Sequence, residues 1–256
     1  MDDHSPDTSQ WGRLWPLGEA LRFLTLIPIG GLPPMSNTTI GKAVPFFPAV
    51  GLIIGALLLP VYGVAGWLWG PFVAATLVVV VWGTLTGGLH LDGLSDTFDA
   101  VMSWRPRERK LEIMKDSRIG AMGAMALVAV LLLKVAFLAA AGNHWWQALL
   151  LAPMLGRWAD IYGIVGFPPA REGGLGRTFQ DDVRPSDFVI ATIVISLAAL
   201  LIAGLHGLIA VTLVWLVTHI IARWWTRDLG GLTGDTYGAL CEIAEVVVLA
   251  TIAAVR

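Results

Sequence analysis

Long apolar runs recur along the chain and are separated by shorter polar connectors. An α-helix rises 1.5 Å per residue, so about 20 consecutive apolar residues cross the hydrocarbon core of a bilayer. Runs of this length predict an all-α fold, a polytopic transmembrane helical bundle of about seven spans. The predicted spans are 46–66, 72–92, 120–141, 145–165, 188–205, 207–225 and 236–255.

The connectors differ in positive charge, and the difference alternates along the chain. Those near Gly70, Asn143 and Gly204 contain no Lys or Arg, whereas the others hold nearly all the basic residues. The positive-inside rule places the basic connectors in the cytoplasm. We therefore predict a multi-pass protein of the cell inner (cytoplasmic) membrane, with its N-terminus inside and its chemistry on the cytoplasmic face.

The segment before the first span predicts a helix of a different kind. Over residues 17–27, leucines fall on one helical face and the charged residues Glu19 and Arg22 on the other. This pattern is typical of an amphipathic helix in the membrane interface, where its expected role is an anchor. The predicted organisation is a cytoplasmic N-terminal segment, 1–45, followed by a single transmembrane domain, 46–256, that carries the chemistry.

Composition supports a membrane protein and excludes a soluble domain. Hydrophobic residues make up 56% of the chain and charged residues 14%, with a mean hydropathy of +0.71, whereas a soluble domain has about 25% charged residues. The single cysteine, Cys241, excludes an intrachain disulfide. The net charge is −2, and we expect the lipid bilayer and small molecules as partners, with no nucleic acid.

Acidic residues gather at the end of the second predicted span. Asp92, Asp96 and Asp99 stand at i, i+4 and i+7, so on a continuing helix they share one face within about 60°. Ionised carboxylates this close repel one another and are costly to desolvate unless they are paired. A divalent cation removes the conflict, and several hard oxygen ligands suit Mg²⁺. The alternative is a solvated helix end, but His90 and the apolar run directly before the carboxylates favour the Mg²⁺ site.

A second acidic group opens the last predicted span. Asp235 follows a glycine-rich stretch, and the predicted roles are a helix cap, which Asp fills well, and a metal ligand; the two are compatible if the helix end faces the metal. Glu242 and Glu245 lie deeper in the same span. Acidic groups inside a membrane are costly, so we expect both to face the bundle interior or a polar cavity.

Basic residues near these acidic groups indicate phosphate binding. Lys115-Asp116-Ser117-Arg118 adjoins the third predicted span, and Lys and Arg there can hold phosphate oxygens. Arg177 ends the loop 171–177, whose glycines can form a backbone nest for an anion, although such a loop alone is a weak signal.

Charged residues inside other spans have structural alternatives. Arg157 and Asp160 are three residues apart in the fourth span and either neutralise each other or belong to a site. Lys134 lies well inside the third span, and we expect its amine to extend outward to the interface.

Together these groups favour phosphoryl or phosphonucleotidyl transfer. Metal ions and basic side chains neutralise charge that develops on a diphosphate, and a carboxylate can accept the proton of an attacking hydroxyl. No Ser or Cys nucleophile with a neighbouring base stands out, so direct displacement is preferred over a covalent intermediate.

Several segments resemble the cobalamin synthase family, whose members are also called adenosylcobinamide-GDP ribazoletransferases. The resemblance runs from about residue 20 to residue 250, and its most specific parts are the H-L-D-G-L-x-D and K-D-S-R stretches. The matching segments are Phe23-Leu-Thr-Leu-Ile-Pro28, Phe46-Phe-Pro-Ala-Val-Gly51, Gly87-Gly-Leu-His-Leu-Asp-Gly-Leu-Ser-Asp96, Lys110-Leu-Glu-Ile-Met-Lys-Asp-Ser-Arg118 and Gly230-Gly-Leu-Thr-Gly-Asp-Thr236.

The resemblance implies an Mg²⁺-dependent enzyme of cobalamin (vitamin B12) biosynthesis at the inner membrane. Such an enzyme joins adenosylcobinamide-GDP to α-ribazole, or to its 5′-phosphate, with loss of GMP. These substrates are therefore the implied partners. A homo-oligomer and an association with other enzymes of the cobalamin pathway both stay open.

The resemblance also implies roles for individual residues. The implied metal ligands are Asp92, Asp96, Asp99 and Asp235. The implied base for the ribazole hydroxyl is Asp116 or Asp99, with Lys115 and Arg118 beside it in the catalytic group. The residues expected on substrate phosphates are Arg177, Arg157 and His90.

Two other classes fit the sequence less well. A CDP-alcohol phosphotransferase carries D-x-x-D-G-x-x-A-R, whereas here Asp92-Gly93 precedes Asp96 and no Ala-Arg follows. A cation-coupled transporter would use the charges inside the spans, but it needs polar groups that open to both sides of the membrane. The polar groups of this chain crowd at one side.

Overall fold

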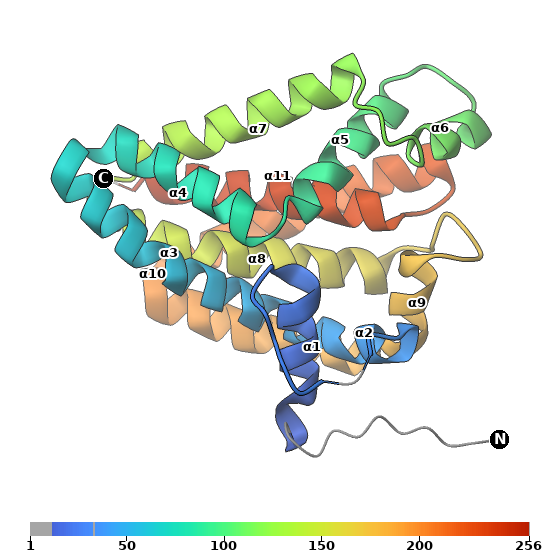
Figure 1. The fold of residues 1–256 in the computed structure, drawn as a ribbon, viewed down its shortest axis with the longest axis horizontal. Helices are drawn as coiled ribbons and strands as arrows, with labels where there is room; N and C mark the ends of the chain where they lie inside the picture. Colours follow the sequence, from blue (N-terminus) through green and yellow to red (C-terminus); the bar gives the residue numbers. More distant parts are fainter. Residues whose placement is uncertain (1–11, 33, 256) are drawn as a thin grey trace.

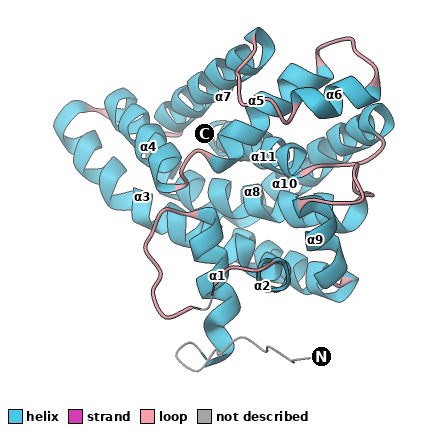
Figure 2. Ribbon diagram, turned by 45° about the vertical axis from the view of Figure 1, so that its right-hand side comes forward, coloured by secondary structure: helices cyan, strands magenta, loops and turns pink. Residues whose placement is uncertain are grey.

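The computed structural model describes residues 12–32 and 34–255 and shows a bundle of helices (Figure 1). These residues form helices joined by loops, with no strand among them (Figure 2). The helices are α1 (Trp15–Leu24), α2 (Asn37–Ala43), α3 (Phe47–Trp69), α4 (Pro71–Leu85), α5 (Leu89–Val101), α6 (Arg107–Ile113), α7 (Ala121–Ala140), α8 (Trp145–Gly166), α9 (Leu175–Asp182), α10 (Pro185–Leu229) and α11 (Gly234–Ala253). Short 3-10 turns precede α1, α3 and α8. The predicted all-α class is confirmed.

The helices of the described residues are long and apolar enough for a polytopic membrane protein. Five stretches qualify alone, and α4 with α5 forms a sixth, broken one. The qualifying stretches are Thr39–Trp69, Ala121–Ala140, Gly142–Gly166, Pro185–Leu229 and Gly234–Ala253.

The longest of these helices, α10, folds back on itself. Its backbone leaves helical geometry at Ala203 and Gly204. A Cβ added to Gly207 would overlap the carbonyl oxygen of Ala199, although a straight helix would separate these two residues by about 12 Å. α10 is therefore a hairpin of two arms. The predicted boundary between the fifth and sixth spans, at residues 204–207, lies at this turn, while the predicted number of seven spans stays a prediction.

The second predicted span, 72–92, is wrong as a continuous helix. α4 ends at Leu85, and α5 begins at Leu89 with its axis bent by 90°. The turn between them uses left-handed backbone at Gly87 (φ 61°) and Gly88 (φ 70°), which residues with a Cβ rarely adopt. The acidic residues predicted at the end of this span therefore lie on a helix of their own, α5.

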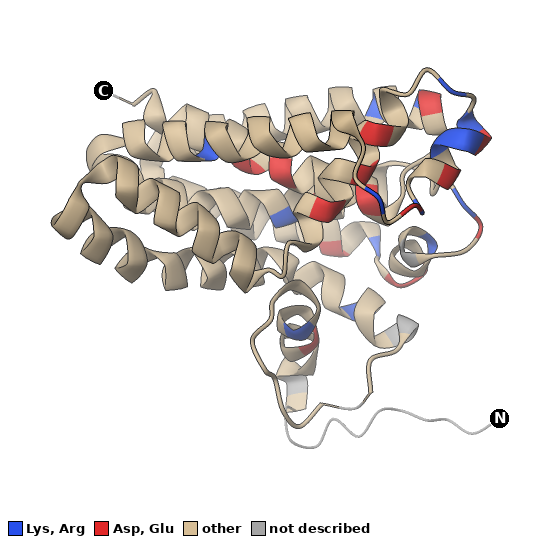
Figure 3. Cartoon of the chain, turned by 45° about the horizontal axis from the view of Figure 1, so that its top comes forward, with Lys and Arg blue, Asp and Glu red and all other residues tan. Residues whose placement is uncertain are grey.

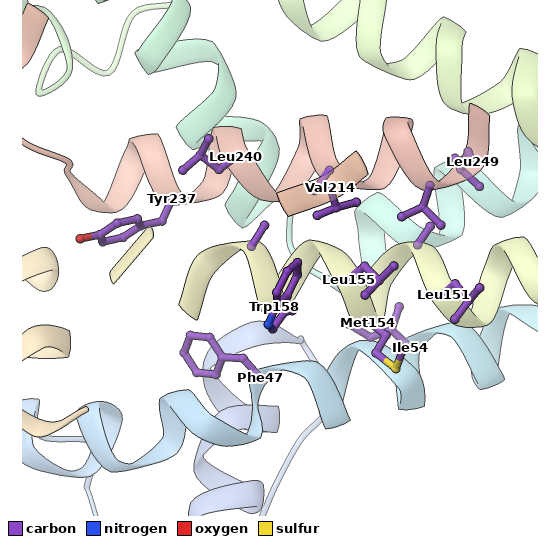
Figure 4. Close-up of a cluster of buried hydrophobic side chains, with 14 of the residues drawn as sticks. Phe47, Ile54, Leu151, Met154, Leu155, Trp158, Val214, Tyr237, Leu240 and Leu249 are labelled. Atoms are coloured by element: carbon purple, nitrogen blue, oxygen red, sulfur yellow. The ribbon is translucent and has the colours of Figure 1, made fainter. Parts of the chain in front are cut away.

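Helix α8 lies at the centre of the bundle, and α3 and α11 pack on it (Figure 4). In its most apolar stretch 83% of the residues are buried, against 17% in α10, so α10 exposes its apolar side chains at the periphery, where lipid would lie. Gly51 and Gly55 of α3 face the backbone carbonyls of Pro153 and Leu149, which a Cβ would overlap. Small residues of this kind let membrane helices approach closely.

The predicted amphipathic helix is present as α1, but one of its charged residues points inward. Glu19 is 1% exposed, pairs with Arg22 and accepts a hydrogen bond from Thr39 Oγ1 at 2.6 Å. The prediction that Glu19 lies on an outer polar face is wrong, because α2 packs against α1 and supplies a partner for the carboxylate. Residues 1–11 and 33 of the predicted N-terminal segment lie outside the described residues.

Charged residues gather at one end of the bundle (Figure 3). The connections through α6 and α9 and the turn from α10 to α11 lie at this end, whereas the turns from α3 to α4 and from α7 to α8 lie at the other (Figure 1). The bend of α10 lies near the start of α8, where Gln147 donates a hydrogen bond to the oxygen of Ile202. The alternation of basic and uncharged connectors along the sequence thus corresponds to two different ends of one bundle. The charged end holds the candidate site.

Candidate active site

The site is built where α5 crosses the beginning of α11. A Cβ on Gly93 would lie 2.7 Å from the backbone oxygen of Asp235, and a Cβ on Gly238 would lie 3.1 Å from Cα of His90. The two backbones can approach this closely only because glycine occupies both contact positions. Helix packing thereby brings Asp92 of α5 next to Asp235 of α11, 143 positions later in the chain.

The predicted carboxylates form one electrostatic group. Asp92, Asp235, Asp99 and Asp116 all lie close enough to Asp96 for their charges to act on it. Asp92 is exposed and the other four are partly exposed. The neighbouring charges that act most strongly on Asp96 are thus all negative. Positive charge reaches the edge of the group, where Arg118 pairs with Asp116 and Arg171 acts on Asp235.

Asp99 differs from the other carboxylates because both of its oxygens have backbone partners. Oδ2 accepts a hydrogen bond from the N–H of Gly120 at 2.7 Å, and Oδ1 accepts one from the N–H of Gly123 at 2.8 Å. These N–H groups belong to the first turn of α7, whose positive dipole end favours a carboxylate. Asp99 therefore joins α5 to α7 and is held in one orientation.

Asp235 does not cap α11, so the predicted capping role is wrong. The cap is Thr233, whose side chain accepts a hydrogen bond from the N–H of Thr236. Asp235 lies two positions into the helix and accepts a hydrogen bond from Thr233 Oγ1 at 3.3 Å. Its carboxylate borders the two cavities described below.

Asp116 and Arg118 pair with each other in the loop between α6 and α7. Arg118 donates to both oxygens of Asp116, with Nη2 at 2.6 Å and Nε at 2.9 Å from the nearer oxygens. These hydrogen bonds lower the pKa of Asp116 from 3.8 to about 2. The Arg118 side chain is 87% exposed, and Lys115 is also exposed, so both cations can reach a ligand that arrives from solvent.

A cavity separates the glycine-rich loop from the beginning of α11. Two backbone hydrogen bonds hold the segment before the loop against Leu232. The N–H of Leu232 donates to the oxygen of Pro168, and the N–H of Ala170 donates to the oxygen of Leu232, both at 2.8 Å. The cavity that results is lined by Arg171, Arg177, glycines of the loop and Asp235. The tertiary structure therefore brings the predicted phosphate ligand Arg177 next to the carboxylate group.

A second cavity also borders Asp235 and was missed by the sequence analysis. Its lining includes Asp92 and Asp235 together with aromatic and polar side chains that are buried or, in Phe23, half-buried. These side chains are Phe23, Phe47, Phe179, Tyr237, His90 and Asp160. They come from six different helices, α1, α3, α9, α11, α5 and α8, so no local pattern in the sequence marks them as one group.

Inside the bundle, the remaining charges pair with one another. Lys134 lies between Glu242, at 2.6 Å, and Glu245, and its amine is 4.4 Å from the centre of the Trp82 ring. Glu245 also pairs with Arg157. The prediction that Glu242 and Glu245 face the interior is confirmed, whereas the prediction that Lys134 extends outward is wrong because two carboxylates hold it inside.

Arg157 and Asp160 do not form the ion pair that one alternative predicted. Arg157 is 1% exposed and pairs with Glu245, while Oδ2 of Asp160 lies 3.6 Å from Nε2 of His90. Arg157 and His90 were both expected on substrate phosphates; the structure places Arg157 within the bundle and His90 at the inner wall of the second cavity.

Among the described residues, one group of metal-ligating types has its ligand atoms within 4.8 Å of one another: His90, Asp160 and Cys241. Nη2 of Arg157 lies 3.3 Å from Nδ1 of this histidine. A permanent positive charge at that distance disfavours a cation in the same place. The predicted metal ligands Asp92, Asp96, Asp99 and Asp235 do not form a group of this kind among the described residues, so metal binding by them stays a prediction.

Comparison with known proteins gives a consistent result. Residues 16–253 match the family described as Cobalamin-5-phosphate synthase. A protein of Roseiflexus sp. (strain RS-1) is 66% identical over 94% of this chain and 90% of its own length. Proteins of Herpetosiphon aurantiacus and Desulforamulus reducens are 55% and 40% identical, over 93% and 90% of this chain and 96% and 92% of their own. All three are named Adenosylcobinamide-GDP ribazoletransferase. No solved structure matches the chain.

Proposed function

Since the chain belongs to the cobalamin-5-phosphate synthase family, we propose that it is an adenosylcobinamide-GDP ribazoletransferase. It transfers the adenosylcobinamide-phosphate moiety of adenosylcobinamide-GDP to α-ribazole, or to α-ribazole 5′-phosphate, and releases GMP. The product is adenosylcobalamin, or its 5′-phosphate. The names of similar proteins that cover more than nine-tenths of the chain support this reaction.

One observation about the site carries the proposal: Asp235 borders two cavities of different chemistry. The cavity with Arg171 and Arg177 suits an anionic diphosphate, because guanidinium groups bind phosphate oxygens in bidentate fashion. The other cavity is aromatic and reaches Asp92. A diphosphate electrophile and a nucleophile can therefore occupy separate cavities that share Asp235.

Mg²⁺ fits the donor set at this junction. Asp92, Asp96 and Asp235 supply carboxylate oxygens that solvent reaches, and the strongest neighbouring charges on Asp96 are all negative. Mg²⁺ keeps several waters and takes one or two carboxylates plus substrate phosphates, so it needs no closed cage of protein ligands. When bound, the ion would neutralise charge on the diphosphate. Because both oxygens of Asp99 accept backbone hydrogen bonds, we place Asp99 in a supporting position.

In the reaction, the attacking hydroxyl oxygen forms a bond to the phosphorus next to cobinamide, and the bond from that phosphorus to the GMP oxygen breaks. Arg171 and Arg177 bind the diphosphate and orient it. The proton of the hydroxyl passes to a carboxylate. Asp116 can take this role once Arg118 leaves it for a substrate phosphate, because loss of those hydrogen bonds returns its pKa toward the ordinary value.

This exchange of partners gives a direct prediction. In the Arg118→Gln variant we expect the pKa of Asp116 to rise from about 2 toward 3.8, because the hydrogen bonds that lower it are lost. Carbon-13 NMR of the labelled carboxyl group measures the titration without substrates. Arg109→Gln is the comparison variant: Arg109 lowers the pKa of Asp116 by its charge alone, without a hydrogen bond, so its loss should raise that pKa less than the loss of Arg118 does. A pKa that stays near 2 in Arg118→Gln would exclude the arginine as its cause.

We further infer that the site faces the cytoplasm at the inner membrane, with the N-terminus inside. The basic connectors at the charged end of the bundle and the uncharged turns at the other end support this orientation.

The first test of the function uses the whole chain in nanodiscs with adenosylcobinamide-GDP, α-ribazole 5′-phosphate and Mg²⁺. We expect GMP release that requires both substrates and stops when EDTA removes the metal, because the diphosphate needs its charge neutralised. Omission of α-ribazole 5′-phosphate controls for simple hydrolysis. Absence of GMP release from well-folded protein under all conditions would rule out the transferase.

A further inference from the structure

The second cavity, which we call the aromatic cavity, has walls of a specific kind. Phe23 and Phe47 stack with ring centres 5.9 Å apart, and Phe179 meets them edge-on at 5.9 and 6.0 Å. Tyr237 continues the wall, with its ring centre 6.5 Å from that of Phe179. Phe47, Phe179 and Tyr237 are each less than 5% exposed. Rings arranged in this way offer faces and edges to a planar aromatic group.

Two residues that line this cavity each have a buried polar atom without a hydrogen-bond partner among the described residues. Oδ1 of Asp160 and the hydroxyl of Tyr237 are buried without a hydrogen bond, and both residues are 3% exposed. The other carboxylate oxygen of Asp160 faces His90. Buried polar groups are normally hydrogen-bonded, because an unpartnered one is costly. A ligand that enters the cavity with a few hydrogen-bonding atoms would satisfy them.

We propose that the aromatic cavity binds the planar, largely apolar base of the nucleophilic nucleoside, a base of the benzimidazole type. This inference rests on the proposed function and names the place of its second substrate. The base stacks against the phenylalanines, and the Tyr237 hydroxyl donates a hydrogen bond to the ring nitrogen that carries no sugar. The sugar then points to the mouth of the cavity, where Asp92 and Asp235 lie.

The other nucleoside base in the reaction, guanine, fits this cavity less well. Guanine has donors and acceptors on most of its edge, and each must find a partner when it is buried. The aromatic cavity offers only Tyr237, Asp160 and His90 as polar side chains beyond the two carboxylates at its mouth. The diphosphate of the guanine nucleotide instead suits the basic cavity, which is lined by Arg171, Arg177 and Asp235. The two nucleosides thus occupy different cavities that share Asp235.

Direct binding tests the proposal without turnover. Calorimetric titration of the whole protein in nanodiscs with α-ribazole should show that Tyr237→Phe weakens binding about tenfold, the effect of losing one hydrogen bond in a buried site. GMP binding should stay unchanged. Tyr62→Phe is the matched control: Tyr62 is also buried, but it stacks on Trp145 at 4.6 Å, away from the aromatic cavity. This control should bind both ligands like the wild type.

A second variant tests the aromatic wall. Phe179→Leu keeps an apolar side chain but removes the ring, so α-ribazole binding should weaken while GMP binding persists. Unchanged α-ribazole binding in both variants would overturn the proposal, and a selective loss of GMP binding would assign the cavity to guanine instead. Failure of this proposal would appear as unchanged α-ribazole binding in the variants. Failure of the proposed function would appear instead as absence of GMP release by the wild-type enzyme.

Discussion

Asp92→Asn is expected to slow Mg²⁺-dependent GMP release by about 100-fold or more, since even loss of an outer partner of a metal ligand costs roughly 10–100-fold. Asp92 is the exposed member of the carboxylate group, it borders the aromatic cavity, and it lies beside Asp235. Asparagine keeps the shape of the side chain but removes the negative charge that would attract the metal. Expression and thermal stability should change little, because the residue is exposed.

The assay compares GMP release at increasing Mg²⁺ for the wild type, Asp92→Asn and Glu112→Gln. Glu112 is an equally exposed acid near the charged end, but it lies in α6 and pairs with Arg109, so its amide variant should behave like the wild type. If the Asp92 variant retains wild-type release and the same Mg²⁺ dependence, Asp92 is not a metal ligand.

Lys134→Met is expected to lower the free energy of unfolding by about 3–5 kcal/mol, the range found when one partner of a buried ion pair is removed. Lys134 is 3% exposed and contacts two carboxylates inside the bundle. Without the amine, Arg157 is the cation that remains next to Glu242 and Glu245 among the described residues. Methionine preserves most of the side-chain volume, so the loss reports on charge rather than on packing.

A double variant separates this electrostatic effect from damage to the helix. Lys134→Met with Glu242→Gln removes one charge of each sign and leaves Arg157 with Glu245, so it should recover a large part of the lost stability. Arg109→Met breaks an exposed pair and should change stability by roughly 0–1 kcal/mol. Unfolding in mild detergent measures all three. A single Lys134 variant as stable as the Arg109 variant would contradict the network.

Local features of the chain were enough to predict the bundle and much of the carboxylate group. The length of an apolar run reports a membrane span because the bilayer has a fixed thickness. Likewise, Asp92, Asp96 and Asp99 share a face through helical periodicity alone, whichever helix carries them. Asp92, Asp96 and Asp99 still lie on one continuous helix, α5, even though the predicted span that contained its first residues is broken at Gly87 and Gly88.

Pairing between distant segments could not be predicted in this way. Periodicity places Lys134 and Glu245 in their own helices but contains no information about which helices touch. The inward orientation of Glu19 likewise depends on Thr39 of a second helix. From a charged residue in an apolar segment, the sequence therefore predicts that a partner of opposite charge or a hydrogen-bonding group is needed. The packing of the helices determines which residue that partner is.

The same distinction holds for the site. The sequence is sufficient to identify a membrane bundle, a row of acidic residues and nearby basic loops, because each depends on residues that are close in the chain. The junction of Asp92 with Asp235 and the aromatic cavity arise only when α5 and α11 meet through Gly93 and Gly238. The basic cavity arises where the segment before the glycine-rich loop bonds to Leu232. Their members come from segments far apart in sequence, and contact between such segments is a property of the folded bundle.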